Sequence, residues 1–274
     1  MDKGIATGLI ISDDNAVLNT QFNRFQDAGA KWVRFDAMYE RWPRTQELIT
    51  MATNAGLTVI PVIRGSGSKD PTKVAQQMNA MMPWFVSKGI SYVEFHNEPN
   101  VGGSWGDRAD PVGYLAALQA FTPAVRQGGG IAVLGGIAGF PTSKDGSSRK
   151  LSPKDWFAAL IEGGMTAGDI DAVAVHCYEM PGTTWWKQVW GDSSSVRGQM
   201  DSNGMKKLPI LVTEAGTNHS VNDQVKVIQA DYNYMNKTTI GPVGPLCIFS
   251  PSHGKYALWP DGNGTRAAKA FKAI

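Results

Sequence analysis

The sequence predicts an α/β fold, a single-domain (β/α)8 TIM barrel over residues 1–274, and three observations support this prediction. Short β-branched, apolar runs alternate with longer amphipathic stretches, and the alternation repeats eight times. The apolar runs are nearly continuous, which is typical of parallel strands that helices cover. No Pro-rich linker, composition break or low-complexity tract interrupts the pattern. We therefore expect one barrel domain.

Each expected strand is a short run rich in β-branched and aromatic residues, bounded by polar or turn-forming residues. In chain order the runs are residues 5–12, 31–39, 58–65, 90–96, 131–140, 170–178, 208–216 and 245–250. Amphipathic patterns between them predict helices over residues 16–30, 44–56, 70–89 and 222–236, and residues 265–274 would form the helix that closes the ring.

Several expected helices carry start and stop signals. An N-cap residue before a proline marks a start, and a glycine in a left-handed conformation marks an end. The starts are Asp70, Asp110 and Ser152, and the ends are Gly29, Gly56 and Gly89. A doubly wound open sheet is the alternative fold, but the first strand-to-helix turn, residues 12–16 (SDDNA), lacks the glycines with which that fold binds phosphate. The sequence therefore favours the barrel.

Charge and hydropathy exclude several classes of partner. The formal net charge is +2 and no window holds a run of like charges, so neither nucleic acid nor an anionic membrane is expected as a partner. No apolar run reaches the roughly 18 residues of a membrane span, and the first residues lack the apolar stretch of a signal peptide. We expect a monomer that is either cytoplasmic or a secreted mature domain.

The cysteines and histidines indicate neither a disulfide nor a cofactor. Cys177 and Cys247 lie in apolar runs far apart in the sequence, so we expect free, buried thiols. The four histidines show no metal-ligand spacing. No metal and no other cofactor is therefore expected.

Two glutamates end expected strands. Glu98 lies at the end of the fourth strand, just after the run of residues 90–96, and Glu214 lies near the end of the seventh run. Active sites of such barrels lie at the carboxyl ends of the strands, where the fourth and seventh strands face each other. A single strand-end glutamate is equally well explained as a loop or helix-capping residue. Two carboxylates held a few ångströms apart, however, are what glycoside hydrolysis requires.

Other polar residues are candidates for the same site. Strand alternation places His176 and Tyr178 on the inward face of the sixth run, although a core histidine and an interface tyrosine remain the alternative. A buried Arg34 needs a carboxylate partner, for which Glu214 is the first candidate and Asp36 or Glu94 are alternatives. Strict alternation points Asn97 away from the site, so Asn97 reaches it only through a bulge.

Tryptophans are candidates for stacking on sugar rings. They are Trp185, Trp186 and Trp190 after the sixth strand, Trp105 after the fourth and Trp259 after the eighth. The cluster after the sixth strand is equally consistent with a helix that buries its indoles.

With these residues assembled, the chain resembles the clan A glycoside hydrolases, which are retaining enzymes on (β/α)8 barrels. The segments that carry the resemblance are NEPN from Asn97, PILVTEAG up to Gly216, HCY from His176 and WVRFD from Trp32. NEPN and VRF are similar to family 39, whereas HCY is similar to family 5, and both families remain open. One departure is the end of the eighth strand, where an aromatic residue is usual and this chain offers Phe249, Ser250 or the later Trp259.

The resemblance implies roles for six residues. Glu98 would be the acid/base, and Asn97 would bind the 2-hydroxyl of the sugar. Glu214 would be the nucleophile, with Tyr178 hydrogen-bonded to it and Arg34 beside it. His176 would line the sugar site, for which Trp259 and Trp185 are further substrate-binding candidates.

The resulting hypothesis is a retaining glycosidase that cleaves a β-linked polysaccharide or oligosaccharide. It expects the pKa of Glu98 to be raised by a less polar setting and the nearby negative charge. The alternative is a carbohydrate-binding barrel without turnover, which needs the tryptophans but not both glutamates. An aldolase-type barrel is disfavoured because it needs a lysine inside a strand, and only Lys31 lies at one.

Overall fold

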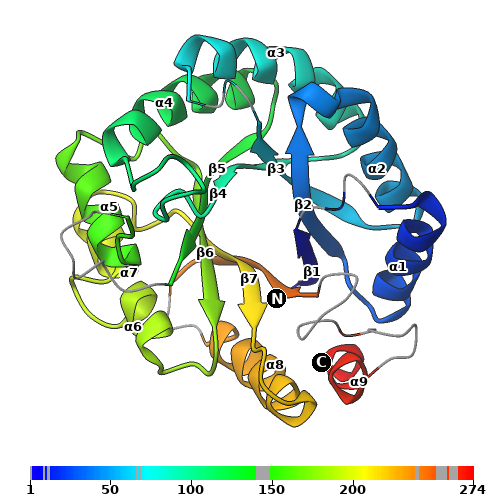
Figure 1. Cartoon of the computed structure of the whole chain (residues 1–274). Helices are drawn as coiled ribbons and strands as arrows, with labels where there is room; N and C mark the ends of the chain where they lie inside the picture. Colours follow the sequence, from blue (N-terminus) through cyan, green and yellow to red (C-terminus); the bar gives the residue numbers. More distant parts are fainter. Residues whose placement is uncertain are drawn as a thin grey trace.

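The computed structural model describes residues 2–8, 10, 13–65, 67, 69–139, 149–237, 241–250, 258 and 265–274. Eight parallel strands close into a barrel in chain order, and the first strand pairs with the last (Figure 1). The strands are β1 (Lys3–Gly8), β2 (Trp32–Met38), β3 (Thr58–Arg64), β4 (Tyr92–Asn97), β5 (Ile131–Ala138), β6 (Ala172–Tyr178), β7 (Ile210–Gly216) and β8 (Val243–Phe249). The predicted fold class is confirmed.

The helices form a ring around the barrel (Figure 1). They are α1 (Asn15–Asp27), α2 (Trp42–Asn54), α3 (Pro71–Ser87), α4 (Pro111–Gln127), α5 (Pro153–Glu162), α6 (Thr184–Trp190), α7 (Val196–Ser202), α8 (Val221–Met235) and α9 (Arg266–Ala273), with a 3-10 turn η1 (Tyr39–Arg41). Among the described helices, none is long and apolar enough to cross a bilayer.

The expected helix signals are present as capping interactions. The side chains of Asp70, Asp110 and Ser152 accept hydrogen bonds from backbone N–H groups in the first turns of α3, α4 and α5. Gly29, Gly56 and Gly89 have φ angles of 80°, 79° and 73°, in the left-handed region that glycine adopts without a steric penalty. The first strand begins earlier than expected, at Lys3, because its ladder to β8 starts there.

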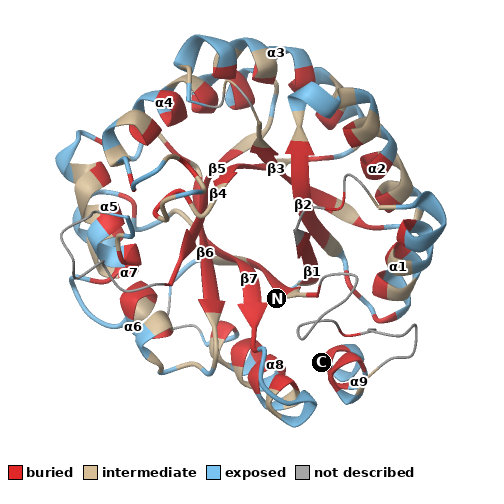
Figure 2. Cartoon of the chain, in the orientation of Figure 1, coloured by how far each residue is buried: buried red, intermediate tan, exposed pale blue. Residues whose placement is uncertain are grey.

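The hydrophobic core consists of one large cluster and two small ones. The large cluster lies between the strands and the helices, and the helices turn their buried residues toward the barrel (Figure 2). Two smaller clusters come from the alternate strand positions: Val133, Ala172, Ala174 and Leu211 form one, and Ala6, Ile60 and Cys247 form the other. Cys177 and Cys247 are buried and free, as expected.

One carboxyl group is buried without a hydrogen-bond partner in the described part of the chain. Asp231 of α8 is fully buried, and neither of its oxygens has a hydrogen-bond partner within the described part of the chain. Burial, with the nearby charge of Glu179, raises the pKa of Asp231 well above its ordinary value. Because this pKa is raised on folding, the ionised form of Asp231 is less favourable in the folded state than in the unfolded chain.

Replacing this carboxyl group is expected to stabilise the fold. Because the pKa is raised on folding, Asp231 lowers stability progressively as the pH rises above its ordinary pKa of about 4. Asp231→Leu should increase the free energy of unfolding by about 1–3 kcal/mol at pH 8 and by much less at pH 4, as measured by urea titration. Asp27→Leu, on the exposed face of α1, is the control and should show no such pH-dependent gain. A loss of stability at pH 8 would contradict this account.

Candidate active site

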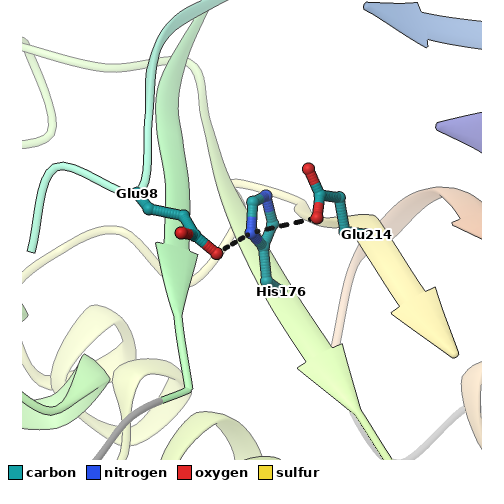
Figure 3. Close-up of side chains that lie close together, drawn as sticks. All are labelled: Glu98, His176 and Glu214. Atoms are coloured by element: carbon teal, nitrogen blue, oxygen red, sulfur yellow. Dashed lines mark hydrogen bonds and ion pairs between the residues drawn. The ribbon is translucent and has the colours of Figure 1, made fainter. Parts of the chain in front are cut away.

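Three side chains meet at the carboxyl ends of β4, β6 and β7 (Figure 3). His176 lies between the two predicted glutamates, with its Nδ1 3.0 Å from Oε1 of Glu98 and 3.7 Å from Oε2 of Glu214. One carboxylate oxygen of Glu98 and one of Glu214 lie within 4.8 Å of each other. The fold therefore brings together two carboxylates that are 116 positions apart in the sequence.

A local distortion of β4 brings both Glu98 and Asn97 into the site. His96 and Glu98 have φ angles of 71° and 49°, which residues with side chains rarely adopt. The distortion breaks strict alternation, so that Asn97 approaches Arg34, whereas His96 lies against the ring of Trp105 with the ring centroids 5.0 Å apart. The expected bulge is not seen in the pairing of β4 with β5, whose register is constant from Tyr92 to Asn97. Instead, the left-handed residues on either side of Asn97 accompany its approach to Arg34.

Two glycines of β5 make room for this arrangement. A Cβ atom on Gly135 would lie 2.1 Å from the carbonyl oxygen of Phe95, and one on Gly136 would lie 2.1 Å from Nε2 of His176. Any side chain at either position would displace the distorted β4 backbone or the His176 ring. Neither glycine was among the site residues predicted from the sequence. A glycine pair inside a strand is nevertheless a recognisable signal of close backbone approach.

Arg34 of β2 joins the site to the barrel interior. Its guanidinium, 1% exposed, donates two hydrogen bonds to Glu94 at 2.8 and 2.7 Å, one to Oε1 of Glu214 at 2.6 Å and one to Oδ1 of Asn97 at 2.8 Å. Burial alone would lower the pKa of Arg34, but the charges of Glu94 and Glu214 raise it above its ordinary value. Both Glu214 and Glu94 are thus partners of Arg34.

Asp36, the third candidate partner, has a different role. Its carboxylate accepts a hydrogen bond at 2.8 Å from Arg64, which ends β3. Burial raises the pKa of Asp36, and the charges of Arg64 and Arg34 only partly offset this effect.

Glu214 is held by donors from two other strands. Besides the bond from Arg34, its Oε2 accepts a hydrogen bond from the Tyr178 hydroxyl. The Tyr178 ring makes edge contacts with Trp185 and Phe249, with centroids 5.5 and 6.3 Å apart. The carboxylate therefore has a fixed orientation and a buried counter-charge.

The tryptophans divide into buried and accessible residues. Trp105 and Trp186 are 2% and 1% exposed, so neither presents a ring face to a ligand. Trp190 stacks on Trp186, as expected for a helix that buries its indoles. Trp185 is half-buried beside Tyr178 and lies close to the backbone of Gly139. Trp259 lies outside the described residues.

The direction of the pKa shift of Glu98 differs from the expectation. Burial raises the pKa of Glu98. The hydrogen bond and charge of His176, with the charges of Arg34 and Arg64, lower it by more than burial raises it, so the pKa of Glu98 is below its ordinary value. The expected raised pKa of Glu98 is therefore wrong. The sequence could not reveal this, because His176 approaches Glu98 only in the folded barrel.

Glu98, His176 and Glu214 also form a potential cation site, because each offers one ligand atom within 4.8 Å of the others. Their sequence spacing gives no hint of this cluster. However, both oxygens of Glu214 already accept hydrogen bonds, from Arg34 and Tyr178. A cation here would lie near the Arg34 guanidinium, so these residues fit a metal poorly.

Comparisons with known proteins identify the fold. No protein-family model and no curated protein sequence matches the chain. Among solved structures, fungal beta-1,4-galactanases are similar at 13% identity with a TM-score of 0.69, covering 100% of this chain and 99% of the other. A rice beta-glucosidase in a covalent complex with glucose matches at 11% identity and a TM-score of 0.63, covering 99% and 97%.

Two other structural neighbours show that the same fold occurs in enzymes with different activities. An endo-1,4-beta-D-mannanase from Thermotoga petrophila is 11% identical with a TM-score of 0.62, covering 99% and 98% of the two chains. A D-psicose 3-epimerase from Clostridium cellulolyticum H10 is 10% identical with a TM-score of 0.57, covering 100% and 96%. The resemblance to barrel glycoside hydrolases is confirmed at the level of the fold. Because an epimerase shares that fold, the function must be argued from the site.

The Arg34 network generates a prediction about stability. Glu94→Gln keeps the shape of the side chain but leaves the buried guanidinium with one fewer counter-charge. We expect it to lower the free energy of unfolding by about 3 kcal/mol in urea titrations. The control is Glu47→Gln, which breaks the exposed pair with Arg44 and should leave stability unchanged. Equal stability of Glu94→Gln and the wild type would show that the network does not contribute to stability.

Proposed function

We propose that the chain is a retaining glycoside hydrolase that cleaves a β-linked polysaccharide or oligosaccharide, with Glu214 as nucleophile and Glu98 as acid/base. The observation that carries the proposal is the close approach of the two carboxylates, because one oxygen of Glu98 and one oxygen of Glu214 lie within 4.8 Å of each other. Retaining enzymes place these groups about 5–5.5 Å apart, whereas inverting enzymes need about 6.5–9.5 Å to admit a water molecule. The short separation supports retention.

In the first step, Glu214 attacks the anomeric carbon while Glu98 gives a proton to the leaving oxygen. Arg34 and Tyr178 hold the Glu214 carboxylate in one orientation for this attack. Asn97 accepts a hydrogen bond from Arg34 through Oδ1, which leaves its amide N–H groups to bind a sugar hydroxyl.

In the second step, Glu98 removes a proton from a water molecule, and this water hydrolyses the bond between the sugar and Glu214. The product keeps the anomeric configuration of the substrate, and Glu98 regains its proton. His176, 3.0 Å from Glu98, contacts the group that carries the proton in both steps.

The site and the structural neighbours support a carbohydrate substrate. In this proposal Trp185, which lies beside Tyr178, is the aromatic residue that stacks on a sugar ring. The neighbours named as galactanase, beta-glucosidase and mannanase act on different sugars, so they do not select one for this chain. A barrel that only binds carbohydrate would need the aromatic residues but not the paired carboxylates.

Variants of the two glutamates test the proposal on a panel of β-linked glycans. Glu214→Gln should abolish cleavage, and Glu98→Ala should reduce kcat/KM by about 10²–10⁴-fold. Dialysis against EDTA should not change the wild-type rate. The control is Glu179→Gln, a carboxylate beside β6 that bonds to Thr217, and it should retain cleavage. Binding without cleavage by the wild type would indicate the non-catalytic barrel instead.

The pH profile of kcat/KM tests the role of His176. An acid with a lowered pKa keeps its proton only at acidic pH, so activity should fall as the pH rises through the pKa of Glu98. In His176→Ala the main influence lowering this pKa is removed, and the basic limb should move to higher pH. His219→Ala, which removes an exposed ring near Glu179, should leave the limb unchanged. A basic limb that stays in place in His176→Ala would rule out this coupling.

A further inference from the structure

Asn100, the last residue of the NEPN segment, has no part in the proposed chemistry, yet its side chain is fully buried. Its Nδ2 donates hydrogen bonds to the carbonyl oxygens of Ala138 at 2.8 Å and Leu151 at 2.7 Å. Its Oδ1 accepts one from the N–H of Ala138 at 2.8 Å. The carbonyl of Asn100 also accepts a hydrogen bond from the N–H of Leu151 at 3.0 Å.

These bonds clamp the turn after β4 to two other segments, the end of β5 and the chain that leads into α5. An isolated bridge between Val101 and Lys150 continues the same contact. Ala138 in turn pairs in register with His176 of β6. Asn100 therefore ties the segment that carries Glu98 to β5, the strand that pairs with β6 beside His176.

The backbone of Glu98 requires such support. Glu98 adopts a left-handed conformation with φ 49°, and so does His96 with φ 71°. Conformations of this kind persist where the surrounding structure enforces them. The ladder between β4 and β5 ends at Asn97 and Gly136, and the N–H of Glu98 adds one more bond, to the carbonyl of Gly136 at 2.9 Å. Beyond that point the side chain of Asn100 holds the turn, together with backbone hydrogen bonds from the N–H of Val101 to the carbonyl of Glu98 at 3.0 Å and from the N–H of Gly102 to the carbonyl of Arg149 at 2.5 Å.

We propose that Asn100 is a positioning residue for the acid/base Glu98, an inference that rests on the proposed function. Without the clamp, the turn is free to relax, and Glu98 moves away from His176 and from the leaving oxygen. The nucleophile is held independently, since Glu214 is bonded by Arg34 and Tyr178. Loss of Asn100 should therefore impair proton transfer selectively, while nucleophilic attack continues.

The test compares two leaving groups on the sugar that the wild type cleaves. A phenyl β-glycoside needs a proton from the acid/base, whereas a 2,4-dinitrophenyl β-glycoside departs without one. For Asn100→Ser we expect kcat/KM to fall at least tenfold with the phenyl substrate and less than threefold with the dinitrophenyl substrate. The ratio of the two values does not depend on the fraction of folded protein, so partial unfolding does not affect the result.

Asn100→Asp is a second variant with the same shape, which removes both N–H donors and should change the ratio in the same direction. The control is Thr122→Val, which removes the hydrogen bond of 2.7 Å that the buried Thr122 hydroxyl donates to the carbonyl of Asp169, before β6 begins. It should leave the ratio unchanged. An equal loss on both substrates, or no loss with the phenyl glycoside, would overturn the positioning role and leave the proposed function intact. A wild type that cleaves no glycan would overturn the proposed function, and this role with it.

Discussion

The buried guanidinium of Arg34 is the interaction on which the candidate site depends. It binds Glu94 and Asn97 of β4 and Glu214 of β7, and it lies on β2, so three strands meet at one cation. Such a group is tolerated in a barrel interior only where its donors are satisfied and its charge is balanced. Glu94 balances the positive charge of Arg34 and has no role in the proposed reaction. The distortion of β4 is part of the same arrangement, because Asn97 reaches Arg34 only through the left-handed residues beside it.

Most of the fold was predictable from the sequence, because its determinants are local. The strand lengths, the Asp–Pro starts of α3 and α4 and the glycines that end helices all appear within a few neighbouring residues. The two catalytic candidates were predictable for a related reason. Strand ends can be located from hydrophobic period, and a barrel places all eight of them around one mouth. Glu98 and Glu214 could therefore be paired before their distance was known.

The details that decide the chemistry were not predictable, because they arise from contacts between distant segments. Alternation alone could not show that His176 lies between the carboxylates, or that its hydrogen bond lowers the pKa of Glu98. Nor could it choose between Glu94 and Glu214 as partners of Arg34, since both are used. Gly136 gave a readable signal, but its role depends on where the ring of His176 lies. Asn100 resembles an ordinary turn residue until its contacts with Ala138 and Leu151 are seen.

The most direct test of the central claim is to trap the covalent intermediate. A 2-fluoro glycoside with a good leaving group slows the second step of a retaining enzyme, so that the labelled protein accumulates and its peptides can be mapped by mass spectrometry. The carboxylate bound by Arg34 and Tyr178 is the one oriented for attack. The account predicts one label per chain, on Glu214. A label on another residue, or cleavage without any covalent adduct and with inversion of the anomeric centre, would contradict it.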